Sequence, residues 1–218
     1  NNPGVNAALA SQYKTRRLVS ISPIIWRDPS WLADDKRREE GVMVNTVSNV
    51  KYTNKYKDGV TYTDAAPVIR FAEVVLNMAE ANARKSSPDL ATALTLLNSV
   101  RNRALANPTT QAYTSSDLAT QSTMVGAILK ERRIEFICEG KRWGDIHRLL
   151  NDDIAPTTGI PRKVANGFPP VGSYTLGTPF SGTLTAAIPS TDRRFLWPIP
   201  LQETNNNPTL KAQQNPGW

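Results

Sequence analysis

Three glutamates recur at intervals of four residues in the segment ILKERRIEFICEGKRWGDIHRL, at Glu131, Glu135 and Glu139. Residues four apart share one face of an α-helix, so the three carboxylates are expected side by side. Two neighbouring carboxylates can work as an acid and base pair, as in a glycosidase. The same segment is rich in arginine, however, and positive neighbours lower carboxylate pKa values and favour permanent ion pairs. The pattern therefore favours structural pairing with arginines such as Arg132 or Arg142, and predicts that the protein is not an enzyme.

The chain has one cysteine, Cys138, and one histidine, His147. Zinc sites and Cys-His dyads need more residues of these types than the sequence offers. Cys138 is expected to be a small buried residue of a helix. We therefore expect no metal site, no cofactor and no catalytic residue.

Two tryptophans, Trp26 and Trp31, lie in or beside the polar segment RDPSWLADDKRREEG. Exposed aromatic rings stack on the flat apolar faces of sugars, and charged side chains at the rim supply hydrogen bonds. Trp26, Trp31, Arg27 and Asp28 are therefore the predicted ligand-binding residues. The alternative is that both tryptophans belong to the core beneath a turn. Weaker candidates of the same kind are Tyr52, Tyr56 and Tyr62.

The 218 residues carry a net charge of +7, with a sequence pI of about 9.7. A basic chain suggests nucleic acid as a partner, but here the basic residues are scattered among carboxylates, as in DDKRREE. No nucleic-acid-binding motif accompanies them, so this partner is not expected. No stretch approaches the roughly 18 consecutive apolar residues of a transmembrane helix.

The helices that must position these residues begin with a helical pattern at residue 67. Apolar residues at three- and four-residue spacing predict an amphipathic helix in APVIRFAEVVLNMAEANARK: Val68, Phe71, Val75 and Met78, with Ala72, Ala79 and Ala83 alongside where the helices would cross. A second helix is predicted in SSPDLATALTLLNSVRNRA, with a cap at Ser87. The link between them is short, so the two helices are expected to pack antiparallel, like one tetratricopeptide-type unit.

The rest of the chain has less regular patterns. Short strands are predicted in LVSISPIIW and GVMVNTVSN, and a hairpin turn at the Asp-Gly step of YKDGVTY. The third helical block is expected to break and restart near Gly140 and Gly144. The predicted fold is mainly α, with tetratricopeptide-like helical hairpins, long irregular loops and small β-hairpins. Its one domain, 1–218, comprises a loop-rich segment 1–66, a helical scaffold 67–150, a loop excursion 151–194 and a closing segment 195–218.

Three segments together, RFAEVVLNMAEANARK, ILKERRIEFICEGKRWGDIHRL and FLWPIPLQETNNNPTLKAQQNPGW, resemble the C-terminal part of the SusD/RagB family of Bacteroidetes outer-membrane lipoproteins. The positions that match the family pattern in the first two segments are Arg70, Glu73, Ala79, Glu80, Ala81, Glu131, Arg132, Arg133, Glu135, Glu139, Gly140, Arg142 and Trp143. In the closing segment they are Pro198, Ile199, Pro200, Glu203, Asn207, Pro208, Gln214, Asn215, Pro216, Gly217 and Trp218.

The resemblance implies a non-catalytic, surface-exposed lipoprotein of the outer membrane. Such a protein would capture oligosaccharides, or peptides in some members, and pass them to a SusC-like TonB-dependent transporter in nutrient uptake. It also implies that the closing segment is laid over the helical scaffold, and that the lipid-bearing cysteine and the N-terminal helices lie outside this chain. Two other classes remain open from the residues alone: a helical-repeat adaptor that binds a protein partner, and a two-carboxylate glycosidase.

Overall fold

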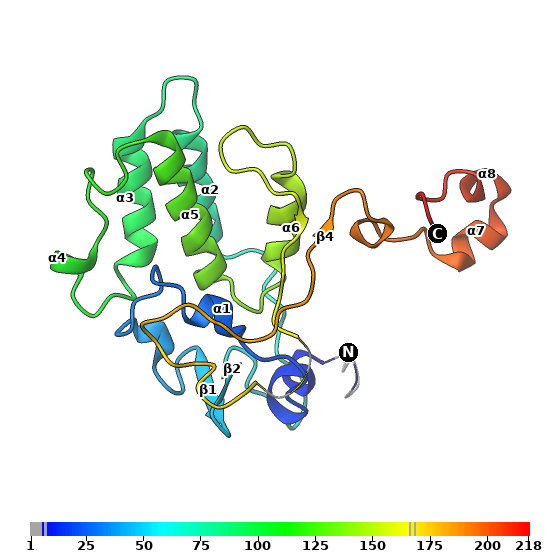
Figure 1. Cartoon of the computed structure of the whole chain (residues 1–218), viewed down its shortest axis with the longest axis horizontal. Helices are drawn as coiled ribbons and strands as arrows, with labels where there is room; N and C mark the ends of the chain where they lie inside the picture. Colours follow the sequence, from blue (N-terminus) through cyan, green and yellow to red (C-terminus); the bar gives the residue numbers. More distant parts are fainter. Residues whose placement is uncertain (1–5, 7, 166, 168) are drawn as a thin grey trace. The chain divides into compact units, whose positions relative to one another are not determined.

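The computed structural model describes residues 6, 8–165, 167 and 169–218, and the chain forms two compact units (Figure 1). The first unit comprises Asn1–Arg142 with Asn166–Gly182, and the second comprises Trp143–Ala165 with Thr183–Trp218. The regular structure is mostly helical with two small antiparallel sheets, which confirms the predicted fold class.

Three helices form the scaffold of the first unit: α2 (Phe71–Ala83), α3 (Leu90–Arg101) and α5 (Gln121–Glu135). They pack against one another side by side (Figure 1), and α2 and α3 form the helical hairpin that the sequence predicts. The cap of α3 is Asp89 and not Ser87, because the Asp89 carboxylate accepts a hydrogen bond from the Thr92 N–H at 3.0 Å. A reciprocal capping box between Thr120 and Thr123 begins α5.

The face of α2 that enters the core agrees only in part with the predicted one. Val68, Phe71 and Met78 are exposed, with Phe71 82% accessible to solvent. Half of the buried positions are alanines, whose small side chains let the backbones of neighbouring helices come close. The buried residues of α2 are Ala72, Val75, Leu76, Ala79, Glu80 and Ala83. Val75 and the alanines are thus buried as expected, and the prediction is wrong only for the larger side chains at Val68, Phe71 and Met78.

A β-hairpin lies in the loop-rich first part of the chain. Strand β1 (Val44–Val47) pairs antiparallel with β2 (Val50–Thr53), and Val47 is opposite Val50. The two turn residues, Ser48 and Asn49, have φ angles of +49° and +66°, the pattern of a type I′ turn. The strand predicted in GVMVNTVSN is therefore confirmed.

Two other local predictions are wrong. The Asp-Gly step of YKDGVTY forms a side-chain-stabilised turn, in which the Asp58 carboxylate accepts from the N–H groups of Thr61 and Thr63 at 2.8 and 2.9 Å. The segment LVSISPIIW contains no described strand; it ends in the short helix α1 (Pro23–Trp26), capped by the Ser22 hydroxyl. Shorter helical turns of the first unit lie at Ser11–Thr15, Lys36–Arg38 and Pro108–Gln111 (α4).

The hydrophobic core between α1, the hairpin and α5 includes a residue of the loop excursion. Tyr174 is buried there, its hydroxyl donates to the Ile21 carbonyl at 2.8 Å, and its own carbonyl accepts from the Trp26 indole at 3.0 Å. Part of the segment expected as a surface loop therefore belongs to the core. The other members of this cluster are Ile25, Trp31, Val44, Val50, Tyr52 and Ile134.

The second unit begins within α6 (Lys141–Arg148), which follows a break at Gly140, where φ is +79°. The break is as predicted, but Gly144 lies inside α6. A two-residue sheet, β3 (Gly159–Ile160) with β4 (Ile188–Pro189), is followed by a 3₁₀ turn at Arg193–Phe195 and by α7 (Leu201–Asn206) and α8 (Pro208–Lys211).

The closing segment is held within the second unit at its start and at its end. The ring of the buried Phe195 stacks on His147 with 4.2 Å between centroids. The Trp218 indole donates to the carbonyls of Arg193 and Leu196, each at 3.0 Å. Trp197 is 75% exposed, so the expectation that the apolar residues of this segment are buried is only partly met. That it covers the helical scaffold stays a prediction.

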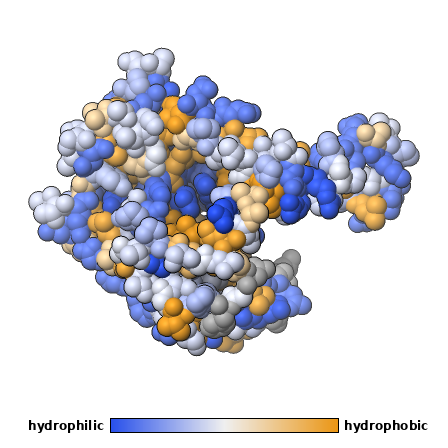
Figure 2. Space-filling model, in the orientation of Figure 1, coloured by the Kyte–Doolittle hydropathy of each residue, from blue (hydrophilic) through white to orange (hydrophobic). Residues whose placement is uncertain are grey.

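Apolar residues reach the surface in separate patches among hydrophilic ones on the face drawn in Figure 2. Among the described residues, no helix has both the length and the apolar character needed to cross a membrane.

Candidate functional site

Trp26 and Trp31 do not form an exposed sugar platform. Their exposed fractions are 5% and 1%, and their rings meet edge to face at 5.3 Å. The guanidinium of Arg38 lies 4.4 Å from the centroid of each ring and donates to the carbonyls of both tryptophans. Burial lowers the pKa of Arg38 to about 10. The expectation of a solvent-exposed tryptophan is therefore wrong, because the loop folds its aromatic residues inward around a cation.

Arg27 and Asp28, the other two predicted ligand residues, are half-buried and make contacts within the protein. Arg27 donates to the carbonyls of Thr178 and Ser173 at 2.5 and 3.4 Å. Asp28 pairs with Lys130 and accepts from the N–H of Ser30 at 3.0 Å. These contacts fix the loop that carries the tryptophans, and a role in ligand contact stays a prediction. Of the weaker candidates, Tyr52 and Tyr56 are buried and Tyr62 is half-buried.

The three glutamates of the 131–139 segment are all ion-paired, as predicted, but their partners come from distant parts of the chain. Arg37 lies 2.6 Å from Glu131 and 3.1 Å from Glu135, and Arg101 lies 3.2 Å from Glu131. Arg132, one of the predicted partners, instead contacts Glu73 and Asn77. The network ties the loop before β1 and the end of α3 to α5.

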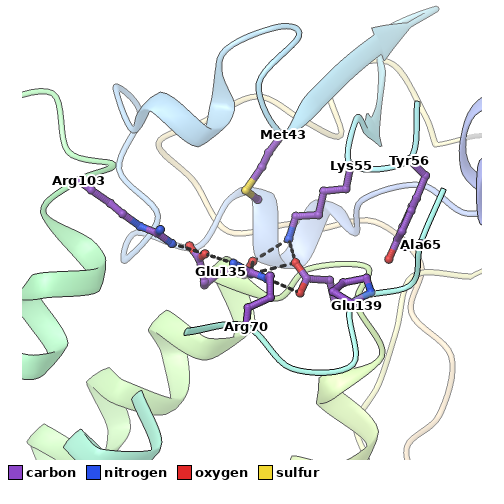
Figure 3. Close-up of a pocket in the computed structure, with 9 residues that line it drawn as sticks. Met43, Lys55, Tyr56, Ala65, Arg70, Arg103, Glu135 and Glu139 are labelled. Atoms are coloured by element: carbon purple, nitrogen blue, oxygen red, sulfur yellow. Dashed lines mark hydrogen bonds and ion pairs between the residues drawn. The ribbon is translucent and has the colours of Figure 1, made fainter. Parts of the chain in front are cut away.

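Toward the surface the network continues as an alternating row of charges (Figure 3): Arg103, Glu135, Arg70, Glu139 and Lys55. Arg70, just before α2, bridges the two carboxylates at 3.0 Å to Glu135 and 2.9 Å to Glu139. Lys55, after β2, pairs with Glu139 and donates to the Glu135 carbonyl at 2.7 Å. The row therefore joins four segments of the first unit.

The electrostatics of Glu135 oppose a role as a proton donor. Burial raises its pKa, but the charge of Arg103 and the hydrogen bond from Arg70 outweigh burial, and the pKa lies below its usual value. A general acid needs a raised pKa to hold its proton near neutral pH. Glu135 is therefore a permanently charged partner of the arginines around it.

Neither of the two residues considered for nucleophilic chemistry has an activated environment. Burial raises the pKa of the Cys138 thiol to about 11, which disfavours the thiolate. The His147 ring packs against Trp143 and Phe195 in the second unit, with centroid distances of 4.5 and 4.2 Å. Among the described residues, no group of three or more His, Cys, Asp or Glu is arranged to hold a metal ion.

A cavity of about 390 Å³ opens beside the row of charges. We call it the network cavity; its walls include Met43, Lys55, Tyr56, Arg70, Arg103 and Glu139. A neighbouring cavity of about 320 Å³ shares Arg70 and Arg103 and is lined on its other side by Phe71, Val75, Ser99 and Val100.

A wider groove of about 590 Å³ lies between loops 29–34 and 110–117, and we call it the loop groove. The Gln111 amide donates to the Asp34 carboxylate at 2.6 Å. Arg101 lies 4.4 Å from the ring centroid of Tyr113, which is half-buried. The loop with the two tryptophans thus lines a groove, but with its other side chains. Tyr113 and Gln111 were missed, although one signal was present: an aromatic residue in the polar stretch NPTTQAYTSSD after a helical hairpin.

Comparison with known proteins bears on the family of this chain. No curated protein and no solved structure matches it. The model of the SusD family matches residues 25–218, which include the helical scaffold, the ion-pair network and the closing segment. The chain therefore belongs to the SusD family, whose members are in general nutrient-binding proteins of the outer membrane without catalytic activity.

Proposed function

We propose that this protein is a non-catalytic capture protein that binds an oligosaccharide in the loop groove. It then passes the ligand to a SusC-like TonB-dependent transporter, while a lipid anchor holds it at the surface of the outer membrane. One observation beyond family membership carries the proposal. The loop groove puts an aromatic ring beside amide and carboxylate groups, on loops that a rigid helical scaffold supports.

The groove has the chemistry that sugar binding uses. Tyr113 supplies a ring, one face of which could cover the C–H face of a pyranose. Gln111 and Asp34 are already hydrogen-bonded to each other, and each can offer further polar atoms to the hydroxyl groups of a sugar. Asp117 is fixed by the N–H and hydroxyl of Thr114, both at 2.7 Å, so a second carboxylate is held at the rim. Few of these groups need to reorganise on binding, which favours affinity.

The ion pairs support binding over turnover. A glycosidase requires two carboxylates, one of which must carry a proton while substrate is bound. Glu131 and Glu135, the closest pair to that arrangement along α5, are each held by at least two arginines. Such carboxylates stay charged, because loss of their charge would leave the buried arginines without compensation.

Isothermal titration of the purified chain with a panel of neutral oligosaccharides and short peptides tests the proposal. We expect at least one oligosaccharide to bind and remain intact. Tyr113→Ala should weaken this binding about tenfold, which corresponds to about 1.4 kcal/mol. Trp197→Ala is the matched control, since it removes an exposed ring of the second unit.

Equal affinities of Tyr113→Ala and the parent would exclude the loop groove as the site. Binding of peptides but of no oligosaccharide would show that the ligand is a peptide. Cleavage of the glycan would refute a purely binding role. Co-purification of the protein with a barrel transporter from outer membranes tests the partner. Recovery of the protein without the transporter, when both are expressed at similar levels, would argue against this partner.

A further inference from the structure

We propose that the network cavity is a second ligand site, separate from the loop groove, and that it takes the carboxylate of an acidic oligosaccharide such as a uronic-acid oligomer. The acid group binds at Arg103, and an adjoining sugar ring covers Phe71. This inference rests on the proposed function for its ligand class, because it assumes that the protein binds glycans.

The charge of the network supports an anion. Its carboxylates, all on buried side chains, are Asp35, Glu131, Glu135 and Glu139, and its cations are Arg37, Lys55, Arg70, Arg101 and Arg103. Five cations against four carboxylates leave one positive charge in excess. The most exposed of these cations is Arg103, whose side chain is 54% accessible to solvent. The excess charge can therefore be met by an anionic ligand at the Arg103 end of the row.

The side chain of Arg103 is also fixed in position and keeps donors for a ligand. Its Nε donates to the Val100 carbonyl at 3.2 Å, and its Nη2 pairs with Glu135. Among the described residues, its Nη1 has no partner, so one corner of the guanidinium keeps its donors for a ligand. Lys55 lines the same cavity and uses two of its three N–H donors, on the Glu135 carbonyl and on Glu139.

The two carboxylates in the cavity wall do not repel an anion strongly, because their charge is already compensated. Glu139 is paired with both Arg70 and Lys55, and Glu135 with Arg37, Arg70 and Arg103. Figure 3 shows Arg103 reaching Glu135 from one end of the row and Lys55 reaching Glu139 from the other. The remaining donors of Arg103 can therefore meet a ligand carboxylate at its end of the row, with Lys55 adding positive charge at the other end.

The apolar side of the site explains why the ligand is a sugar chain. Phe71 is 82% exposed and lines the neighbouring cavity, which shares Arg70 and Arg103 with the network cavity. An exposed ring beside a cation suits a pyranose whose C–H face covers the ring while its acid group reaches the arginine. The cavities of about 390 and 320 Å³ are each within the usual size of ligand sites, so together they favour an oligomer.

Titration of the full chain with trigalacturonate and with its methyl ester tests this proposal. We expect the acid to bind at least tenfold more tightly than the ester, and this preference to shrink as salt screens the charges. Arg103→Gln should abolish the preference for the acid and leave binding of neutral oligosaccharides unchanged. Phe71→Ala should weaken binding of the acid several-fold, and melting curves of each variant check that the fold is intact.

Two controls separate this site from the loop groove. Arg194→Gln removes an exposed arginine of the second unit that is paired with Asp192, and should keep the preference for the acid. Tyr113→Ala should keep it as well, while it weakens neutral glycans. Loss of acid binding in Tyr113→Ala, equal binding of acid and ester, or no binding of the acid would each overturn the second site. If the acid binds and neutral glycans do not, the result would instead count against the loop groove.

Discussion

The guanidinium of Arg37 lies 2.6 Å from the carboxylate of Glu131, although 94 residues separate them in the chain. Both side chains are buried, and Arg37 also pairs with Asp35 at 2.7 Å. The contact fastens the segment after Trp31 to the C-terminal half of α5. Removing one partner of a buried pair is costly because the other charge stays buried without compensation.

Glu131→Gln is therefore expected to lower the free energy of unfolding by about 3 kcal/mol. The substitution keeps the size of the side chain but takes the negative charge away from Arg37 and Arg101. Urea unfolding followed by circular dichroism measures the change. The control is Asp192→Asn, which breaks an exposed pair with Arg194 and should cost less than about 1 kcal/mol. Similar losses in the two variants would mean that the buried network is not a stabilising element.

The helices could be predicted from the sequence because their signals are local. The apolar spacing of α2 and α3 and the short link between them are sufficient for an antiparallel hairpin. Which face of α2 enters the core is not a local property, since both faces carry apolar residues. The alanine face is buried because α3 and α5 pack close against it.

The candidate site was less predictable, because its contacts join distant segments. The spacing of the glutamates indicates that cations must meet them, but not that Arg37 and Arg103 supply the charge. The tryptophans lie in a polar loop, and only contacts such as that between Trp26 and Tyr174, 148 residues away, decide that their rings are buried. Tyr113 has no periodic pattern around it, so sequence spacing could not single it out.

Trp31→Ala should destabilise the protein strongly. The ring is 1% exposed and packs against Trp26 and Arg38, so its removal leaves a cavity in the core. We expect a loss of about 3–5 kcal/mol, measured by denaturant unfolding. Trp197→Ala, which removes a ring that is 75% exposed, should cost less than about 1 kcal/mol. Equal stability of Trp31→Ala and the parent would contradict the burial of this ring.

The thiol of Cys138 should react slowly in the native protein. Its pKa of about 11 and its partial burial leave little thiolate at pH 8. Because it is the single cysteine of the chain, labelling with a chromogenic disulfide reagent reports this position alone. We expect labelling to be at least about tenfold faster in concentrated urea, where the thiol has its ordinary pKa. A native rate as high as the unfolded one would indicate an activated nucleophile.

Acid should weaken the fold partly through Glu135. The positive charges around this carboxylate hold its folded pKa below the unfolded value, so its stabilising contribution is fully present above about pH 4.3. As the pH falls through the folded pKa, the carboxylate is protonated and the contribution is lost.

Glu135→Gln cannot titrate, so its free energy of unfolding should be lower than the parent's at pH 7 and should fall less between about pH 5 and pH 3. Urea unfolding at a series of pH values measures both slopes. Glu203→Gln removes an exposed carboxylate of α7 and should follow the parent. Parallel slopes for Glu135→Gln and the parent would show that the ion pairs of Glu135 add no pH-dependent stability.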